Sequence, residues 1–116
     1  MEMFVNPSKI WLHKDFVDFR KSINGLLLIV EENIPMSPFD EALFIFCNKN
    51  RDKLKILYWD KTGFALWYKR LEKDKFKWPT GHEQDCLELN EQQLGWLLSG
   101  YDVIGHRPLF YSSVTL

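Results

Sequence analysis

Basic and aromatic residues alternate in the middle of the chain, and together they indicate a particular chemistry. Between Lys49 and Trp78 the sequence holds ten basic and four acidic residues, a net charge of +6 within a chain whose total is −1. Lysine and arginine neutralise the phosphates of a nucleic acid, and flat rings stack on its bases. The segment therefore predicts a surface that contacts DNA.

The candidate contacts are cations that follow β-type spacing, together with the tryptophans between them. Residues two apart share one face of a strand, which would pair Lys53 with Lys55 and Lys75 with Lys77. The predicted nucleic-acid-binding residues are Arg51, Lys53, Lys55, Trp59, Lys69, Arg70, Lys75, Lys77 and Trp78. The alternative remains open that the tryptophans form the core and the lysines only solvate its outer face.

The other groups capable of chemistry form no recognisable site. His13, His82 and His106 are scattered, and none stands in a nucleophile or metal-binding motif. His82 and Cys86 are four residues apart, a spacing that could share a zinc ion on a helix, but the nearby Pro79 predicts a loop, and two ligands do not complete a zinc site. We therefore predict no metal and no other cofactor.

The carboxylates are a further candidate for chemistry, because phosphoryl-transfer enzymes hold their metals with such groups. Asp18, Asp60 and Asp74 occupy positions expected of helix caps and turns, where a carboxylate has a structural purpose. We predict no catalytic residue and no enzymatic activity. A nuclease built on three carboxylates remains an alternative hypothesis.

Hydrophobic spacing predicts one long helix near the start of the chain. Asp15 is a suitable N-cap, and Pro35 and Pro38 end the helical pattern. The predicted helix covers residues 15–33 and follows a short strand at residues 10–13. Its apolar stripe consists of Phe16, Phe19, Ile23, Leu26, Leu27, Val30 and Ile34.

The residue pattern in the remainder of the chain predicts consecutive strands followed by a short helix. Strands are predicted at residues 42–48, 53–59, 64–72 and 75–78, separated by polar or glycine-containing turns. A capping box of Asn90 and Gln93 predicts a helix at residues 90–99. The expected fold class is α+β, with an antiparallel meander sheet of four or five strands packed with the long N-terminal helix and the shorter C-terminal one.

Length and composition favour one domain over residues 1–116, with no linker or repeat. Cys47 and Cys86 are far apart, and the first residues lack the pattern of a secretion signal. The longest apolar run, Leu26 to Val30, is far shorter than the roughly 20 residues that span a bilayer. These features predict a cytoplasmic chain with reduced thiols and no membrane partner.

Several blocks of residues resemble those of a known family. They lie at residues 18–26, 42–48, 54–64, 68–72 and 76–79, and the most specific are Trp59-Asp-x-Thr-Gly-Phe64 and Tyr68-Lys-Arg-Leu-Glu72. The chain resembles the TnpB-type accessory proteins, encoded by the second open reading frame, of the insertion-sequence group numbered sixty-six. These proteins are unrelated to the RNA-guided nuclease also named TnpB. The resemblance covers residues 10–100 and leaves a tail at about 101–116.

The resemblance implies a bacterial mobile-element protein, encoded beside a transposase and needed for efficient transposition. The sequence departs from the family pattern at Phe19 and Ser22 near the first helix, and at Cys47, where family members often have arginine. We expect a non-catalytic DNA-binding accessory factor that acts through the basic, aromatic β region. The alternative is a protein-interaction module that docks on the transposase without contacting DNA.

Overall fold

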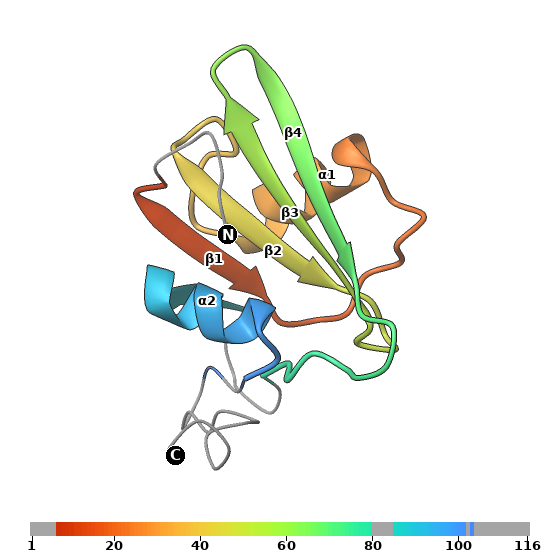
Figure 1. The fold of residues 1–116 in the computed structure, drawn as a ribbon. Helices are drawn as coiled ribbons and strands as arrows, with labels where there is room; N and C mark the ends of the chain where they lie inside the picture. Colours follow the sequence, from red (N-terminus) through yellow and green to blue (C-terminus); the bar gives the residue numbers. More distant parts are fainter. Residues whose placement is uncertain (1–6, 80–84, 102, 104–116) are drawn as a thin grey trace.

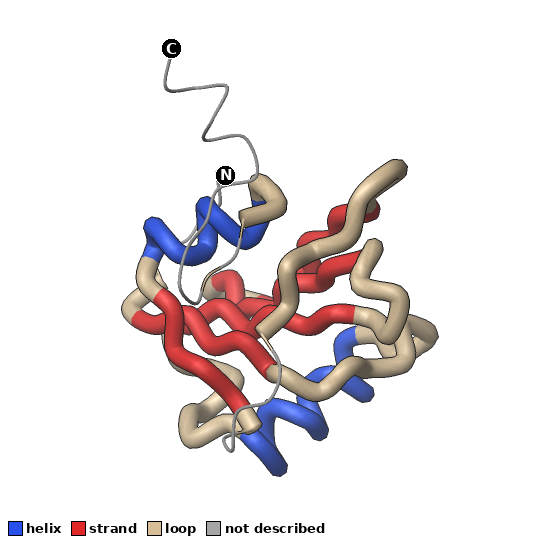
Figure 2. The backbone as a smooth tube through the Cα atoms, turned by 90° about the horizontal axis from the view of Figure 1, so that it is seen from below, coloured by secondary structure: helices blue, strands red, loops and turns tan. Residues whose placement is uncertain are grey.

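The computed structural model describes residues 7–79, 85–101 and 103, which form five strands and two helices. One sheet has the strand order β4-β3-β2-β1-β5. Helix α1 lies behind this sheet in Figure 1, and α2 lies in front of it. The view in Figure 2 shows the same three layers, with one helix on each side of the strands. In chain order the elements are β1 (Lys9–His13), α1 (Ile23–Asn33), β2 (Ala42–Cys47), β3 (Lys53–Asp60), β4 (Gly63–Arg70), β5 (Cys86–Leu89) and α2 (Glu91–Leu98).

The sheet is mixed, so the prediction of an antiparallel meander was wrong. Strands β2, β3 and β4 do form an antiparallel meander, but β1 pairs with β2 in parallel, with Ile10 opposite Leu43. Strand β5 then pairs antiparallel with β1. A parallel neighbour requires a crossover connection, and the chain between β1 and β2 supplies one through α1.

The long N-terminal helix was also predicted wrongly, because α1 begins at Ile23 rather than at Asp15. The residues before it form a loop that is bound to the sheet. The Val17 N–H donates to the Cys47 carbonyl at 2.9 Å, and the carbonyls of Phe19 and Lys21 accept from the ammonium of Lys55. These tertiary hydrogen bonds satisfy backbone groups that a helix would otherwise pair, so the helical spacing of the apolar residues does not decide the local structure.

The predicted strand at residues 75–78 is absent, and the fifth strand lies elsewhere. After β4 the chain turns across the end of the sheet without pairing in it, and Phe76 and Trp78 are buried there. Strand β5 occupies the opposite edge, beside β1. The fifth strand pairs with the start of the chain, a long-range contact that local patterns do not report.

Side chains alternate between two apolar clusters, one on each face of the sheet. On the α1 face, Leu26 and Val30 of the helix pack against Phe44 and Leu57 of the strands. On the α2 face, Leu97 packs with a cluster that includes Ile10, Leu12, Ile45, Ile56 and Phe76. All six residues of β2 are buried, because this strand is covered on both faces. Neither helix of the described part of the chain has the length and apolar content needed to cross a membrane.

The predicted C-terminal helix is present, and its start has the predicted capping box. The Asn90 side chain accepts from the Gln93 N–H at 2.8 Å, and the Gln93 side chain accepts from the Asn90 N–H at 2.9 Å. These two bonds fix the first turn of α2, which presents Leu94 and Leu97 to the core.

Removing this cap is expected to destabilise the fold measurably. Asn90→Ala should lower the free energy of unfolding by about 1 kcal/mol, because it leaves the Gln93 N–H without its acceptor. Chemical denaturation followed by circular dichroism measures this. Gln92→Ala, an exposed position in the same turn, is the control and should change stability by less than about 0.5 kcal/mol. Equal effects of the two variants would contradict the role of the cap.

Candidate nucleic-acid interface

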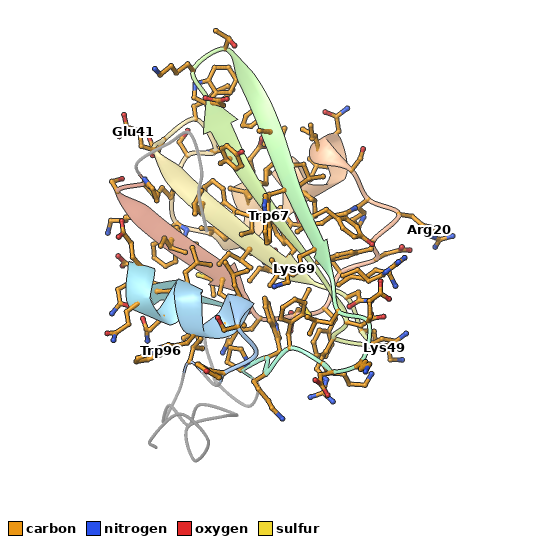
Figure 3. The ribbon with its side chains drawn as sticks, in the orientation of Figure 1. Arg20, Glu41, Lys49, Trp67, Lys69 and Trp96 are labelled. Atoms are coloured by element: carbon orange, nitrogen blue, oxygen red, sulfur yellow. The ribbon has the colours of Figure 1, made fainter. Side chains whose placement is uncertain are left out.

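Two basic segments, distant in sequence, lie side by side at one end of the sheet. The Phe76 N–H donates to the Arg51 carbonyl, and the Leu71 N–H donates to the Asp52 carbonyl, both at 2.7 Å. In Figure 1 the β2–β3 turn and the segment after β4 meet at the lower end of the sheet, where Figure 3 places Lys49. We name this surface the basic end. It consists of Lys49, Arg51, Lys53, Arg70, Lys73, Lys75 and Lys77.

The turn between β2 and β3 is held by one asparagine side chain. The Asn48 amide donates to the Asp52 carboxylate at 2.7 Å, and its oxygen accepts from the N–H groups of Asp52 and Lys53. The hydrogen bond from Asn48 also lowers the pKa of the Asp52 carboxyl. Arg51 adopts a left-handed backbone conformation, with φ of 61°. This network fixes the direction in which the basic turn leaves the sheet.

The basic end has more cations than its carboxylates can pair. Its two segments contain three acidic residues, Asp52, Glu72 and Asp74, so the net charge is +4. Arg70 pairs with Glu72 at 2.9 Å, and Lys53 lies 3.5 Å from Asp52. The remaining cations are exposed and form no ion pair within the described ranges. Of these, Lys75 donates to the Asn50 carbonyl at 2.6 Å, which ties the two segments together.

Two of the predicted cations donate hydrogen bonds to main-chain carbonyls of other segments of the protein. Lys55 is 7% exposed, and its ammonium donates to the carbonyls of Phe19 and Lys21 at 2.9 Å each. The same nitrogen lies 4.8 Å from the Phe19 ring centroid, and burial lowers the pKa of Lys55. Lys69 donates to the Leu98 carbonyl at the C-terminus of α2, where a cation is favourable. Both ammonium groups therefore hold the fold together and face away from the basic end.

The tryptophans do not interleave with the exposed lysines. Trp78 is 5% exposed, and its indole N–H donates to the Lys14 carbonyl at 2.8 Å, so it has no open ring face for stacking on a base. Trp59 lies near the opposite end of β3 from Lys53. Trp67 packs against the apolar cluster of the α2 face. The exposed cations of the predicted surface thus lie together at the basic end, whereas the tryptophans that were predicted to stack on bases lie elsewhere.

Trp59 belongs instead to a group of three rings near the β3–β4 turn. The ring centroid of Trp59 lies 5.1 Å from that of Phe39 and 4.9 Å from that of Phe64, and Phe39 and Phe64 are 5.3 Å apart. We name these residues the ring cluster. Phe39 is 60% exposed, which is unusual for such a large apolar side chain. Sequence patterns missed Phe39, because it lies between two predicted elements.

Two residues of the basic end, Lys49 and Lys73, were not among the predicted contacts. Both belong to the same basic segment of the sequence and are exposed. Both lie outside the strands, since Lys49 precedes β3 and Lys73 follows β4. The net charge of the whole segment is the sequence signal that includes them.

The carboxylates considered for a metal site lie apart. Asp18 is bound by Arg20, whose hydrogen bond lowers the pKa of that carboxyl to about 2. Asp60 ends β3, whereas Asp74 lies in the segment after β4. No group of three metal-binding side chains is found among residues 7–79, 85–101 and 103. His82 and His106 lie outside these ranges.

Comparison with known proteins gives a family and uncharacterised relatives. The model of the family described as IS66 Orf2 like protein matches residues 8–107. A protein of Sinorhizobium fredii, the uncharacterized protein y4hO, is 33% identical over 94 residues, which cover 81% of each chain. A second protein of this organism, y4jC, also uncharacterized, is 34% identical over 86 residues, which cover 74% of this chain and 73% of the relative. No solved structure matches significantly.

The two kinds of lysine are expected to respond differently to substitution. Lys55→Met should lower the free energy of unfolding by about 1–3 kcal/mol, because the carbonyls of Phe19 and Lys21 lose their donor. Lys49→Met, at an exposed position of the basic end, is the matched control and should be nearly neutral. Urea denaturation of both variants measures this difference. An unchanged stability for Lys55→Met would show that the two hydrogen bonds are unimportant.

Proposed function

Since the chain belongs to the IS66 Orf2-like family, whose role is accessory to transposition, we propose that it is a non-catalytic factor that binds DNA through the basic end. The observation that supports this proposal is the meeting of two basic segments at one end of the sheet, with a net charge of +4. A concentrated positive surface attracts the phosphate backbone and releases its counterions, which supplies most of the affinity of non-specific binding.

The arrangement of the cations favours contacts with phosphates over contacts with bases. Most of the exposed cations lie outside the strands, on the β2–β3 turn and the segment after β4, and within the described ranges none of them lies on a helix that could enter a groove. The buried ring of Trp78 offers no stacking platform. Phosphate contacts position a protein on DNA but do not read its sequence directly. Binding through the basic end should therefore depend strongly on salt and weakly on sequence.

The hydrogen bonds beneath the basic end support the same proposal. The Asn48 side chain fixes the β2–β3 turn, and the bond from Lys75 to the Asn50 carbonyl joins that turn to the second basic segment. Cations held in place before binding lose less conformational freedom when DNA arrives. The network thus favours affinity by holding these cations in place.

Removing cations from the basic end should weaken DNA binding more than removing the same charge elsewhere. Compared with the unmodified chain, Lys49→Ala with Lys77→Ala should raise the Kd for a labelled duplex by about tenfold and reduce the slope of log affinity against log salt by about 2. Fluorescence anisotropy between about 50 and 200 mM salt measures both quantities.

The control removes two cations far from the basic end, Lys9→Ala with Lys61→Ala. Lys9 lies on β1 and pairs with Glu88 at 3.6 Å, and Lys61 lies in the β3–β4 turn. This double variant has the same net charge as the test variant and should bind almost as the unmodified chain does. If the two double variants lose affinity equally, or if binding ignores salt, the basic end is not the DNA site.

The ring cluster favours a second candidate function, contact with the transposase encoded by the same element. Exposed aromatic side chains contribute strongly to protein interfaces, because they bury a large area with few rotatable bonds. Phe39 is such a side chain, and Trp59 and Phe64 hold its ring in place. The ring cluster lies beside the turn at the other end of β3 and β4 from the basic end, so contact with protein and contact with DNA would not compete.

Phe39→Ser should therefore reduce binding to the cognate transposase about tenfold or more, as expected for an aromatic hot spot. Leu28→Ser is the matched control, because Leu28 is apolar and 58% exposed on α1, outside the ring cluster. A pull-down with purified transposase followed by titration measures the change. If the chain binds no transposase, or if both variants bind equally, the ring cluster has no such role.

A further inference from the structure

Strand β4 is an edge strand that is apolar along most of its length and incompletely covered. It has eight residues and lies at the end of the sheet order, beside β3 alone. None of its residues is fully buried, whereas every residue of β2 is. Trp67 projects on the α2 face, and Leu66 and Tyr68 project on the α1 face. Tyr68 is 49% exposed, so apolar surface remains open beside this edge.

The backbone of β4 directs a row of hydrogen-bonding groups away from the sheet. The Leu71 N–H donates to the Asp52 carbonyl, and the register pairs Lys69 with Leu54 and Trp67 with Ile56. Since antiparallel bonding alternates along a strand, Trp67 and Lys69 bond to β3, and the N–H and C=O groups of Leu66 and Tyr68 point outward. No backbone hydrogen bond from the described loops reaches these outward groups.

The usual protections of an edge strand are missing from β4. It contains no proline, and its pairing with β3 is continuous from Gly63 to Arg70, without a bulge. Its charged residues, Lys69 and Arg70, stand at one end only. The other edge of the sheet differs, because β5 has four residues and carries Glu88, which pairs with Lys9. Natural proteins shorten or charge an edge that must stay unpaired.

We propose that β4 pairs antiparallel with β4 of a second copy of this chain, which joins the two sheets into one. In a register centred on Trp67, this residue lies opposite itself, Leu66 opposite Tyr68, and Phe64 opposite Arg70. Cross-strand pairs of apolar and aromatic side chains stabilise such a sheet, and Arg70 meets a ring rather than another cation. A twofold axis uses both free edges at once and so closes the assembly as a dimer.

The strand's own charges favour a second copy as the partner. Antiparallel self-pairing places Lys69 and Arg70 of one copy at the opposite end of the interface from Lys69 and Arg70 of the other copy, so the like charges do not face each other. The apolar centre, from Phe64 to Tyr68, then meets an identical apolar centre. Of the basic end only Arg70 belongs to β4, whereas Lys49 and Lys77, the two cations replaced in the DNA-binding test, lie outside it, so the two proposals are tested at different residues.

Replacing an outward backbone N–H with proline tests the pairing. Leu66→Pro removes a donor that β3 does not use, and proline is tolerated at such positions of edge strands. The unmodified chain should sediment as a dimer at about 100 μM, which is roughly a hundredfold above the Kd of an association with micromolar affinity. The Leu66→Pro variant should sediment as a monomer with an unchanged circular dichroism spectrum.

The matched control places proline on the other edge. The Lys14 N–H donates to the Asp85 carbonyl, so by the same alternation the Glu88 N–H of β5 points outward. Glu88→Pro should remain a dimer. A monomeric unmodified chain, a dimeric Leu66→Pro variant, or dissociation caused by Glu88→Pro would each overturn the proposal. If the unmodified chain is a monomer and Leu66→Pro abolishes transposase binding instead, the edge accepts a strand of that protein.

A covalent test keeps the proposal falsifiable if Leu66→Pro does not fold. In the proposed register the two Trp67 positions face each other without mutual backbone hydrogen bonds, a geometry close enough for a disulfide. Oxidised Trp67→Cys should form a covalent dimer, and Tyr68→Cys, which faces Leu66, should not. Cys47 and Cys86 are present in both variants, so any disulfide that they form contributes equally to the two results. Absence of the Trp67→Cys dimer would contradict this register and the pairing based on it.

Discussion

The complete burial of β2 is the constraint on which the rest of the structure depends. Its six residues place apolar side chains on both faces, so the sheet must be covered on both sides. Helix α1 covers one face, and as the connection from β1 it also makes β1 parallel to β2. Helix α2 and the buried Phe76 and Trp78 cover the other face. The layers, the mixed sheet and the path of the chain after β4 all satisfy this requirement.

The same path creates the basic end. Because Phe76 and Trp78 are drawn into the core of the α2 face, the lysines that alternate with them remain outside, next to the β2–β3 turn. Lys55 shows the opposite outcome, since its ammonium is enclosed where it binds two loop carbonyls. The basic end, the ring cluster and the edge of β4 are therefore surfaces left open by a sheet whose centre is fully covered. Each is suited to a different kind of contact.

Much of the secondary structure could be predicted from local patterns, and the errors have identifiable physical causes. The strands expected at residues 42–48, 53–59 and 64–72 are β2, β3 and β4 within about two residues at each boundary, and the capping box marks the start of α2. The helix predicted from Asp15 begins at Ile23, because the sheet and Lys55 bind the preceding loop. The pairing of β1 with β2 and β5 joins residues distant in sequence, and no local pattern reports it.

The sequence by itself determined the family, since the spacing of its motifs agrees with the match over residues 8–107, and it determined that the positive charge is concentrated between Lys49 and Trp78. Only the tertiary structure decided which of those residues face outward. Lys55, Lys69 and Lys75 have the same side chain, yet the first binds a loop, the second binds the end of α2, and the third joins the two segments of the basic end. A lysine's role depends on the carbonyls and rings that the fold brings to it from elsewhere in the chain.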